Sequence, residues 1–119
     1  LIEQFLDTSG NKQLRTHQSP MGGTMRLGEY PFETKDNSNL QKAYGKGISY
    51  ERHRHRYEAN PAYKEILEKN GMVITGQSDG LIEVVEIPEH KWFVGVQFHP
   101  EFTSSLQTPN PIILDFIKA

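Results

Sequence analysis

The sequence has 119 residues, which allows at most one domain with a modest hydrophobic core. Its 13 Lys and Arg residues against 15 Asp and Glu residues give a net charge of −2, which excludes the strongly basic surface typical of nucleic-acid binders. Because there is no cysteine, the composition also excludes a disulfide framework, a thiolate zinc site and a cysteine nucleophile within these residues.

No apolar run approaches the roughly 18 residues of a membrane-spanning helix, and residues 1–6 lack the basic start and long apolar stretch of a secretory signal. We therefore expect a cytoplasmic protein. Apolar positions at helical spacing in residues 1–7 predict the tail of an amphipathic helix, as if the sequence were cut from a larger protein. Residues 8–13 are polar, contain a glycine and are expected to form a loop.

Three glycines in residues 22–28 permit backbone angles that other residues avoid. This segment is either a tight turn or a mobile flap, and composition alone favours a turn before a short strand at residues 29–33. A cluster of polar capping residues at 36–39 then predicts a short helix over residues 40–44, which the glycines in residues 45–47 end.

Residues 52–56 alternate three arginines with two histidines, and in a strand this places all the arginines on one face and both histidines on the other. Arginines bind carboxylates or phosphates through paired hydrogen bonds, so the arginine face favours an anion pocket. The alternative is a solvated edge strand whose charge Glu51 and Glu58 partly neutralise. No carboxylate cluster or helical spacing accompanies His53 and His55, so no metal site is expected.

The second half of the sequence predicts sheet between two helices. An Asn-Pro pair caps a helix over residues 62–69, and two prolines precede an apolar helix over residues 112–117. Between them, three β-rich runs are separated by one turn with Asp-Gly and one with proline. The strands are expected at residues 72–76, 81–87 and 92–98, with turns at residues 77–80 and 88–91. The pattern predicts an α/β fold in which helices flank a three-stranded β-meander.

The last of these strands runs into His99-Pro100-Glu101. Because Pro100 fixes the backbone between them, the imidazole and the carboxylate can lie on one side of the segment. A carboxylate bonded to one ring nitrogen fixes the tautomer, and the other nitrogen can then take a proton from a nucleophile. His99 and Glu101 are therefore candidates for a base and its orienting group. The alternative is a histidine that ends a strand and bonds locally.

Three separated blocks resemble one enzyme family. They are residues 22–28, 50–58 and 95–102, which read Gly-Gly-Thr-Met-Arg-Leu-Gly, Tyr-Glu-Arg-His-Arg-His-Arg-Tyr-Glu and Gly-Val-Gln-Phe-His-Pro-Glu-Phe. The last block resembles class I glutamine amidotransferases in general, and the first two resemble the glutaminase domain of the CTP synthases. The resemblance implies that residues 1–119 are the C-terminal half of such a domain, without its nucleophile-bearing part and without the amidoligase domain.

By this resemblance, His99 and Glu101 are two members of a Cys-His-Glu triad that hydrolyses glutamine. Arg56 contacts the bound glutamine at its α-carboxylate, whereas Arg52 and Arg54 serve structure or electrostatics. The lid segment beside the site comprises Gly22, Gly23, Thr24, Met25, Arg26, Leu27 and Gly28. Because the triad cysteine is not among these residues, the isolated fragment is expected to be inactive.

The same resemblance implies a ligase of pyrimidine nucleotide biosynthesis, which aminates UTP to CTP with ATP and with ammonia from glutamine. No cofactor or metal is expected in the fragment, while the absent amidoligase domain would bind ATP and Mg. The expected effector is GTP and the expected assembly of the intact enzyme is a homotetramer. Neither nucleic acid nor membrane is an expected partner.

Two alternatives of other classes stay open. One is the glutaminase-like domain of another amidotransferase or a γ-glutamyl hydrolase, against which the two more specific blocks argue. The other is a non-catalytic binding module that keeps the fold without a nucleophile, as the lack of cysteine indicates.

Overall fold

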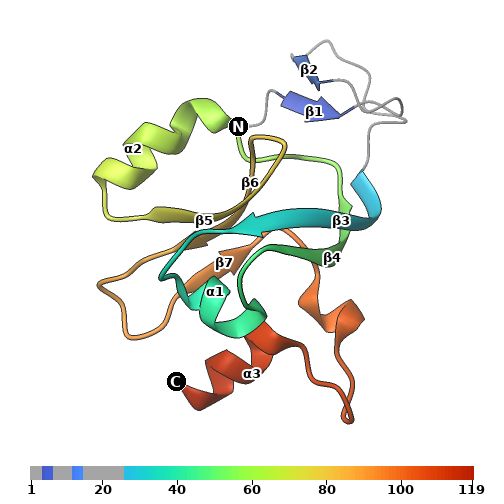
Figure 1. Cartoon of the computed structure of the whole chain (residues 1–119). Coiled ribbons are helices and arrows are strands. Elements are labelled where there is room, and N and C mark those ends of the chain that lie inside the picture. The colour runs from blue at the N-terminus through green and yellow to red at the C-terminus, as the bar shows by residue number, and fades with distance from the viewer. Residues whose placement is uncertain (1–3, 7–11, 15–25) are drawn as a thin grey trace.

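The computed structural model describes residues 4–6, 12–14 and 26–119. The strands are β1 (Gln4–Leu6), β2 (Lys12–Leu14), β3 (Arg26–Thr34), β4 (Ile48–His55), β5 (Val73–Ser78), β6 (Leu81–Glu86) and β7 (Val94–Val96). The helices are α1 (Asn39–Tyr44), α2 (Lys64–Lys69) and α3 (Pro111–Lys118), with 3₁₀ turns η1 (Pro61–Tyr63) and η2 (Pro100–Thr103). Figure 1 shows α1 and α3 side by side, apart from α2.

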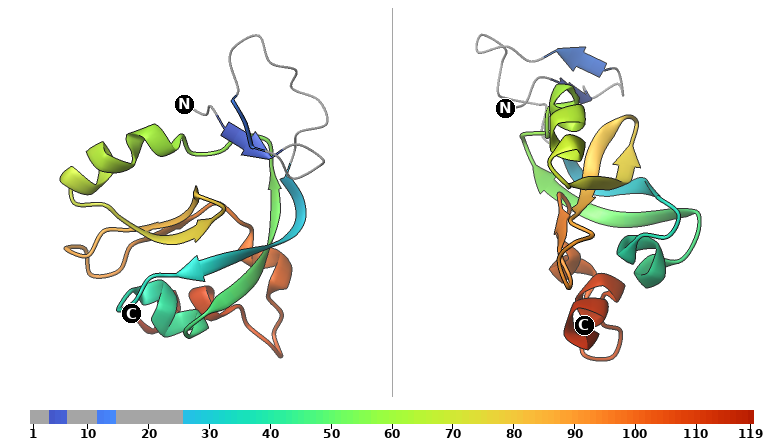
Figure 2. Two further views of the ribbon diagram at one scale, coloured as in Figure 1. Left: turned by 45° about the horizontal axis from the view of Figure 1, so that its top comes forward. Right: turned by 90° about the vertical axis from the view of Figure 1, so that its left-hand side faces the viewer.

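The larger sheet has the strand order β4-β3-β5-β6-β7, and each neighbouring pair is antiparallel. β3 pairs with β4 along nearly its whole length, but with β5 only through Glu33 and Thr34. The β3–β4 ribbon therefore curves away from the β5–β6–β7 meander (Figure 2). A register shift at Gly76 adds to this curl, because a bulge increases the local twist of a strand.

One apolar cluster joins elements that lie far apart in the sequence. It consists of Phe32 from β3, Leu40 from α1, Val84 from β6, Phe98 after β7, and Ile112 from α3. The rings of Phe32 and Phe98 stack with their centroids 5.2 Å apart. Since Phe98 directly precedes the His-Pro-Glu turn, the core fixes the point at which that turn begins.

Most predicted elements are confirmed, including the mixed α/β fold and its β-meander. Ser38 caps α1 and Asn110 caps α3 through side-chain oxygens that accept backbone N–H groups. The strand expected at residues 29–33 is longer and already begins at Arg26. The helix expected over residues 62–69 begins as the 3₁₀ turn η1.

The predicted N-terminal elements are wrong where the structure describes them. Gln4–Leu6 and Lys12–Leu14 pair as antiparallel strands, instead of forming a helix tail within residues 1–7 and a loop within residues 8–13. A short apolar run fits the helical and the extended period equally well, so its sequence does not select between them. The cross-strand backbone hydrogen bonds decide the conformation.

Gly76 is a position at which the core tolerates no side chain. A Cβ atom there would lie 2.7 Å from Val84 Cγ2 and 3.0 Å from Leu40 Cδ2. We expect Gly76→Ala to lower the free energy of unfolding by about 1–3 kcal/mol through overpacking. Gly95→Ala is the matched control, because its Cβ would meet Val85 Cγ2 alone at close range, at 3.1 Å. Urea unfolding measures both variants, and equal losses would contradict this account.

Candidate active site

His99 and Glu101 form a hydrogen-bonded pair on the turn that follows β7. His99 Nδ1 lies 2.7 Å from Glu101 Oε1, and the two side chains are 36% and 57% exposed. The His99 backbone N–H donates to the Arg52 carbonyl at 2.9 Å, which ties the turn to β4. Phe102 stacks on the imidazole with ring centroids 5.0 Å apart. The predicted juxtaposition of imidazole and carboxylate is therefore present at the surface.

The hydrogen bond between His99 and Glu101 also determines which ring nitrogen of His99 carries the proton. The hydrogen bond from His99 lowers the pKa of Glu101, so this carboxylate is ionised near neutral pH. An ionised carboxylate only accepts hydrogen bonds, and Nδ1 must therefore carry the proton. In the neutral imidazole, Nε2 is then the nitrogen that can accept a proton from a reacting group.

The arginine and histidine alternation holds within β4. Arg52 and Arg54 are exposed on one face of the strand, and His53 is buried on the other. β4 ends at His55, however, so the prediction of three arginines on one strand face does not extend to Arg56. Arg56 instead lies in a bend, where the strand period no longer dictates its direction.

Side chains hold this bend from two sides. Gln97 Nε2 donates to the Tyr57 carbonyl at 2.8 Å. On the other side, His55 Nε2 lies 2.8 Å from a Glu58 carboxylate oxygen, so that this pair brackets the bend at Arg56. Gln97 belongs to the segment that leads to His99, and the bend is thus connected to the His–Glu turn.

A cluster of charged side chains is buried under the β3–β4 ribbon. Arg26 donates to Glu83, and its Nη1 also lies 3.3 Å from a Glu58 oxygen. His53 Nε2 lies 3.6 Å from Glu83. This cluster is not predicted from the sequence, although a carboxylate flanked by apolar residues on both sides, as Glu83 is in β6, is a signal for an inward-facing charge partner. In the alternative of a solvated edge strand, Glu58 partly neutralises the arginine run; in the structure it pairs with Arg26 and His55.

Burial sets the protonation of this cluster. Desolvation, reinforced by the Arg26 charge, lowers the pKa of His53 to about 3. Desolvation raises the pKa of Glu83, while the adjacent Arg26 charge opposes this rise. His53 is therefore neutral in the folded protein at neutral pH.

A separate network around the buried carboxylate Glu51 holds the His–Glu turn from the interior. Glu51 accepts hydrogen bonds from Tyr44 Oη at 2.6 Å, from Thr103 Oγ1 at 2.7 Å and from Asn110 Nδ2. Burial, with the Glu51 carboxylate adding to it, raises the pKa of Tyr44. Because Thr103 belongs to η2, which also carries Glu101, this network anchors the candidate site to α1 and α3.

The predicted lid segment is described only at its end. Residues 22–25 lie outside the described part of the chain, so neither the turn nor the flap is tested there. Arg26 is buried, Leu27 is exposed, and Gly28 has a φ of +108°, a left-handed conformation that disfavours other residues. Leu27 borders an open groove of about 510 Å³ that Arg52, Arg54 and Phe102 also line.

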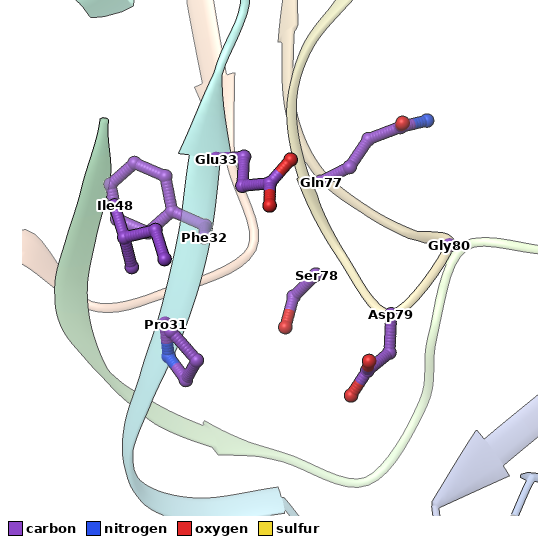
Figure 3. Close-up of a pocket in the computed structure, with 8 residues that line it drawn as sticks. All are labelled: Pro31, Phe32, Glu33, Ile48, Gln77, Ser78, Asp79 and Gly80. Carbon is purple, nitrogen blue, oxygen red and sulfur yellow. The ribbon is translucent and has the colours of Figure 1, made fainter. Parts of the chain in front are cut away.

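Another open pocket, of about 340 Å³, lies where β3 and β5 diverge. Figure 3 shows Glu33, Ser78 and Asp79 directed toward this space, from β3, from the end of β5 and from the turn that follows β5. No group of three or more His, Asp or Glu residues in the described ranges is arranged to hold a metal ion. Across those same ranges, no helix has the length and apolar character to cross a membrane.

Comparison with known sequences points in one direction. The sequence profile described as Glutamine amidotransferase class-I matches residues 4–119. A CTP synthase from Sulfurimonas denitrificans is 67% identical over 120 residues, which are 100% of this chain and 22% of that protein. A CTP synthase from Helicobacter hepaticus is 64% identical over 119 residues, with coverage of 99% and 22%. The chain thus spans about a fifth of the length of these relatives.

Comparison with solved structures gives the same direction. The structure titled "Trypanosoma brucei CTPS - glutaminase domain with bound acivicin" matches with a TM-score of 0.78 and 40% sequence identity. The match covers 84% of this chain and 41% of that one. The curled antiparallel sheet and its helices therefore correspond to part of that domain.

The buried His53 predicts a specific pH dependence of stability. Its pKa is about 3 when folded and about 6.5 when unfolded, so the unfolded chain binds more protons between these values. Its contribution is complete above pH 6.5 and is lost as the pH falls toward 3, by up to about 1.4 kcal/mol per pH unit. We expect His53→Phe to flatten the slope of unfolding free energy between about pH 5 and pH 6.5, as measured by urea unfolding.

The control for this measurement is His90→Phe at an exposed position. The raised pKa of Glu83 acts with the opposite sign above pH 4.5, but its causes, burial and the neighbouring Arg26, Glu58 and His55 charges, are kept in the parent and in both variants. An unchanged slope in His53→Phe would contradict the burial of a neutral imidazole.

Proposed function

The chain belongs to the class I glutamine amidotransferases, and from this premise we propose that it carries the His and Glu members of a Cys-His-Glu triad in a CTP synthase. The observation that supports this proposal best is the hydrogen bond between His99 and Glu101 on an exposed turn, within a block typical of the family. The 119 residues contain no cysteine, so the nucleophile must come from outside them. Residues 1–119 are then a part of the glutaminase domain.

In this proposal, His99 Nε2 takes the proton of the cysteine thiol, and the thiolate attacks the side-chain carbonyl carbon of glutamine. Collapse of the tetrahedral intermediate breaks the C–N bond, and His99 returns the proton to the leaving ammonia. His99 then takes a proton from water, which attacks the glutamyl thioester and releases glutamate and the thiol. Glu101 holds the required tautomer and stabilises the imidazolium that forms in each half-reaction.

Arg56 is proposed to bind the α-carboxylate of glutamine. Its guanidinium can form two parallel hydrogen bonds to a carboxylate, which fix the substrate as well as attract it. The bend that contains Arg56 is hydrogen-bonded to the segment of His99 through Gln97. The proposed substrate-binding group and the proposed base are therefore held in a fixed relative position. Residues 22–28 are proposed as the lid of this site, with residues 26–28 forming its base at the start of β3.

For the whole cytoplasmic enzyme, we propose that the released ammonia aminates UTP to CTP in an ATP-dependent ligase reaction. An amidoligase domain outside these 119 residues would bind UTP, ATP and Mg. GTP would act as effector, and a homotetramer would be the assembly. The similarity to CTP synthases along nearly the whole chain supports this assignment over other amidotransferases, γ-glutamyl hydrolases and a non-catalytic module.

Glu101→Gln tests the triad in the full-length protein. We expect glutamine-dependent CTP formation to fall by about two to four orders of magnitude, because a neutral amide stabilises neither the tautomer nor the imidazolium. CTP formation from added ammonia should be unchanged, since it bypasses glutamine hydrolysis. Glu89→Gln, at an exposed position, is the matched control. Wild-type glutamine-dependent rates in Glu101→Gln, or ammonia release by the 119-residue chain alone, would overturn the mechanism.

Arg56→Lys tests the substrate contact. A lysine keeps the charge but loses the bidentate geometry, so we expect the KM for glutamine to rise about tenfold. The kcat should change less, because the α-carboxylate is bound alike in the ground state and the transition state. Steady-state glutaminase kinetics of full-length Arg56→Lys and of Arg52→Lys separate the two positions. Equal effects at both would argue against a specific contact by Arg56.

A further inference from the structure

We propose that Gln97 is a positioning residue, whose side chain sets the distance between Arg56 and His99. This inference rests on the proposed function, because it takes Arg56 as the group that binds glutamine. The side-chain amide of Gln97 donates from Nε2 to the carbonyl oxygen of Tyr57 at 2.8 Å. Tyr57 directly follows Arg56, so this hydrogen bond holds the backbone of the bend itself.

Gln97 is suited to this task because its own backbone is fixed. Its N–H donates to the Glu83 carbonyl in β6 at 2.8 Å. The next residue, Phe98, is buried in the core against Phe32. A side chain that projects from such a fixed segment can hold the group to which it is hydrogen-bonded, here the Tyr57 carbonyl, at a set position relative to the meander.

The bend, in contrast, lies beyond the regular ladder. The pairing of β3 with β4 ends at Arg26 and His55, so Arg56 and Tyr57 follow the last cross-strand pair. The His55–Glu58 pair at 2.8 Å closes the bend onto itself, but it does not relate the bend to the His99 segment. The Gln97 amide does make that connection.

In the described part of the chain, a backbone and a side-chain hydrogen bond link β4 and its bend to the segment of residues 97–99. The first joins backbone atoms, His99 N–H and the Arg52 carbonyl, and it persists whatever the side chain. The second depends on the Gln97 amide alone. Removal of that amide should leave the His99–Glu101 pair in place while the Arg56 bend shifts. The expected defect is thus in glutamine binding and not in proton transfer.

The test compares Gln97→Leu and Gln97→Glu in the full-length protein. Leucine has a similar size without a donor, and we expect it to raise the KM for glutamine about two- to tenfold, as for loss of one neutral hydrogen bond. Glutamate should raise it further, because a carboxylate oxygen facing the Tyr57 carbonyl is repulsive. The kcat and the ammonia-dependent rate should stay within about twofold of the parent. Gln77→Leu, on β5 and away from the bend, is the matched control.

A double-mutant cycle with Arg56→Lys separates this inference from the proposed function. If Gln97 acts through Arg56, Gln97→Leu should have a smaller effect on KM in the Arg56→Lys background than in the parent. If Arg56→Lys alone leaves the KM unchanged, the assignment of Arg56 to glutamine is wrong. If Arg56→Lys raises the KM and Gln97→Leu does not, the positioning role is wrong. A parallel fall of kcat and of the ammonia-dependent rate in Gln97→Leu would also overturn it, because a general structural defect would then explain the loss.

Discussion

The stacking of Phe98 on Phe32 is the contact on which the geometry of the candidate site depends. Phe98 is almost fully buried, whereas the side chain of the following residue, His99, is 36% exposed. The chain therefore passes from the centre of the core to the surface within one peptide unit. A histidine placed in this way has little freedom to move along the chain direction, and the Glu101 carboxylate then needs to fix only the orientation of its ring.

Beneath this surface, the interior of the curled sheet contains several charged side chains. Arg26, Glu83 and Glu51 are each buried, and each has a partner of opposite charge or several hydrogen-bond donors. Such groups add little net stability compared with apolar residues, but removal of one partner leaves an unpaired buried charge at a cost of about 3–5 kcal/mol. These networks therefore contribute little to the free energy of unfolding, but they disfavour alternative arrangements of the strands in which a partner would be lost.

Local sequence patterns were sufficient for the elements whose signals are short in range. The helix caps, the β-meander and the His99–Glu101 pair follow from residues that are close neighbours in the chain. The Arg26–Glu83 contact did not, because it joins positions 57 residues apart and depends on how the ribbon curves over the meander. The place of Arg56 was also missed, since strand alternation carries no information on where a strand ends. The β1–β2 pair was missed because three-residue segments have no reliable period.

The narrow attachment of β3 to β5 has a consequence for how this architecture can change. Because only two residue pairs form that ladder, contacts outside it, such as the hydrogen bond from the Gln97 side chain to the bend, contribute to the angle between the ribbon and the meander. The β3–β4 ribbon leads into the bend that contains Arg56, and the β5–β6–β7 meander leads into His99. Substitutions of side chains that lie between the ribbon and the meander can thus change the distance from Arg56 to His99. The hydrogen bonds within the ribbon and within the meander are then kept. The distance between Arg56 and His99 can therefore change in this fold while the His99–Glu101 pair is kept.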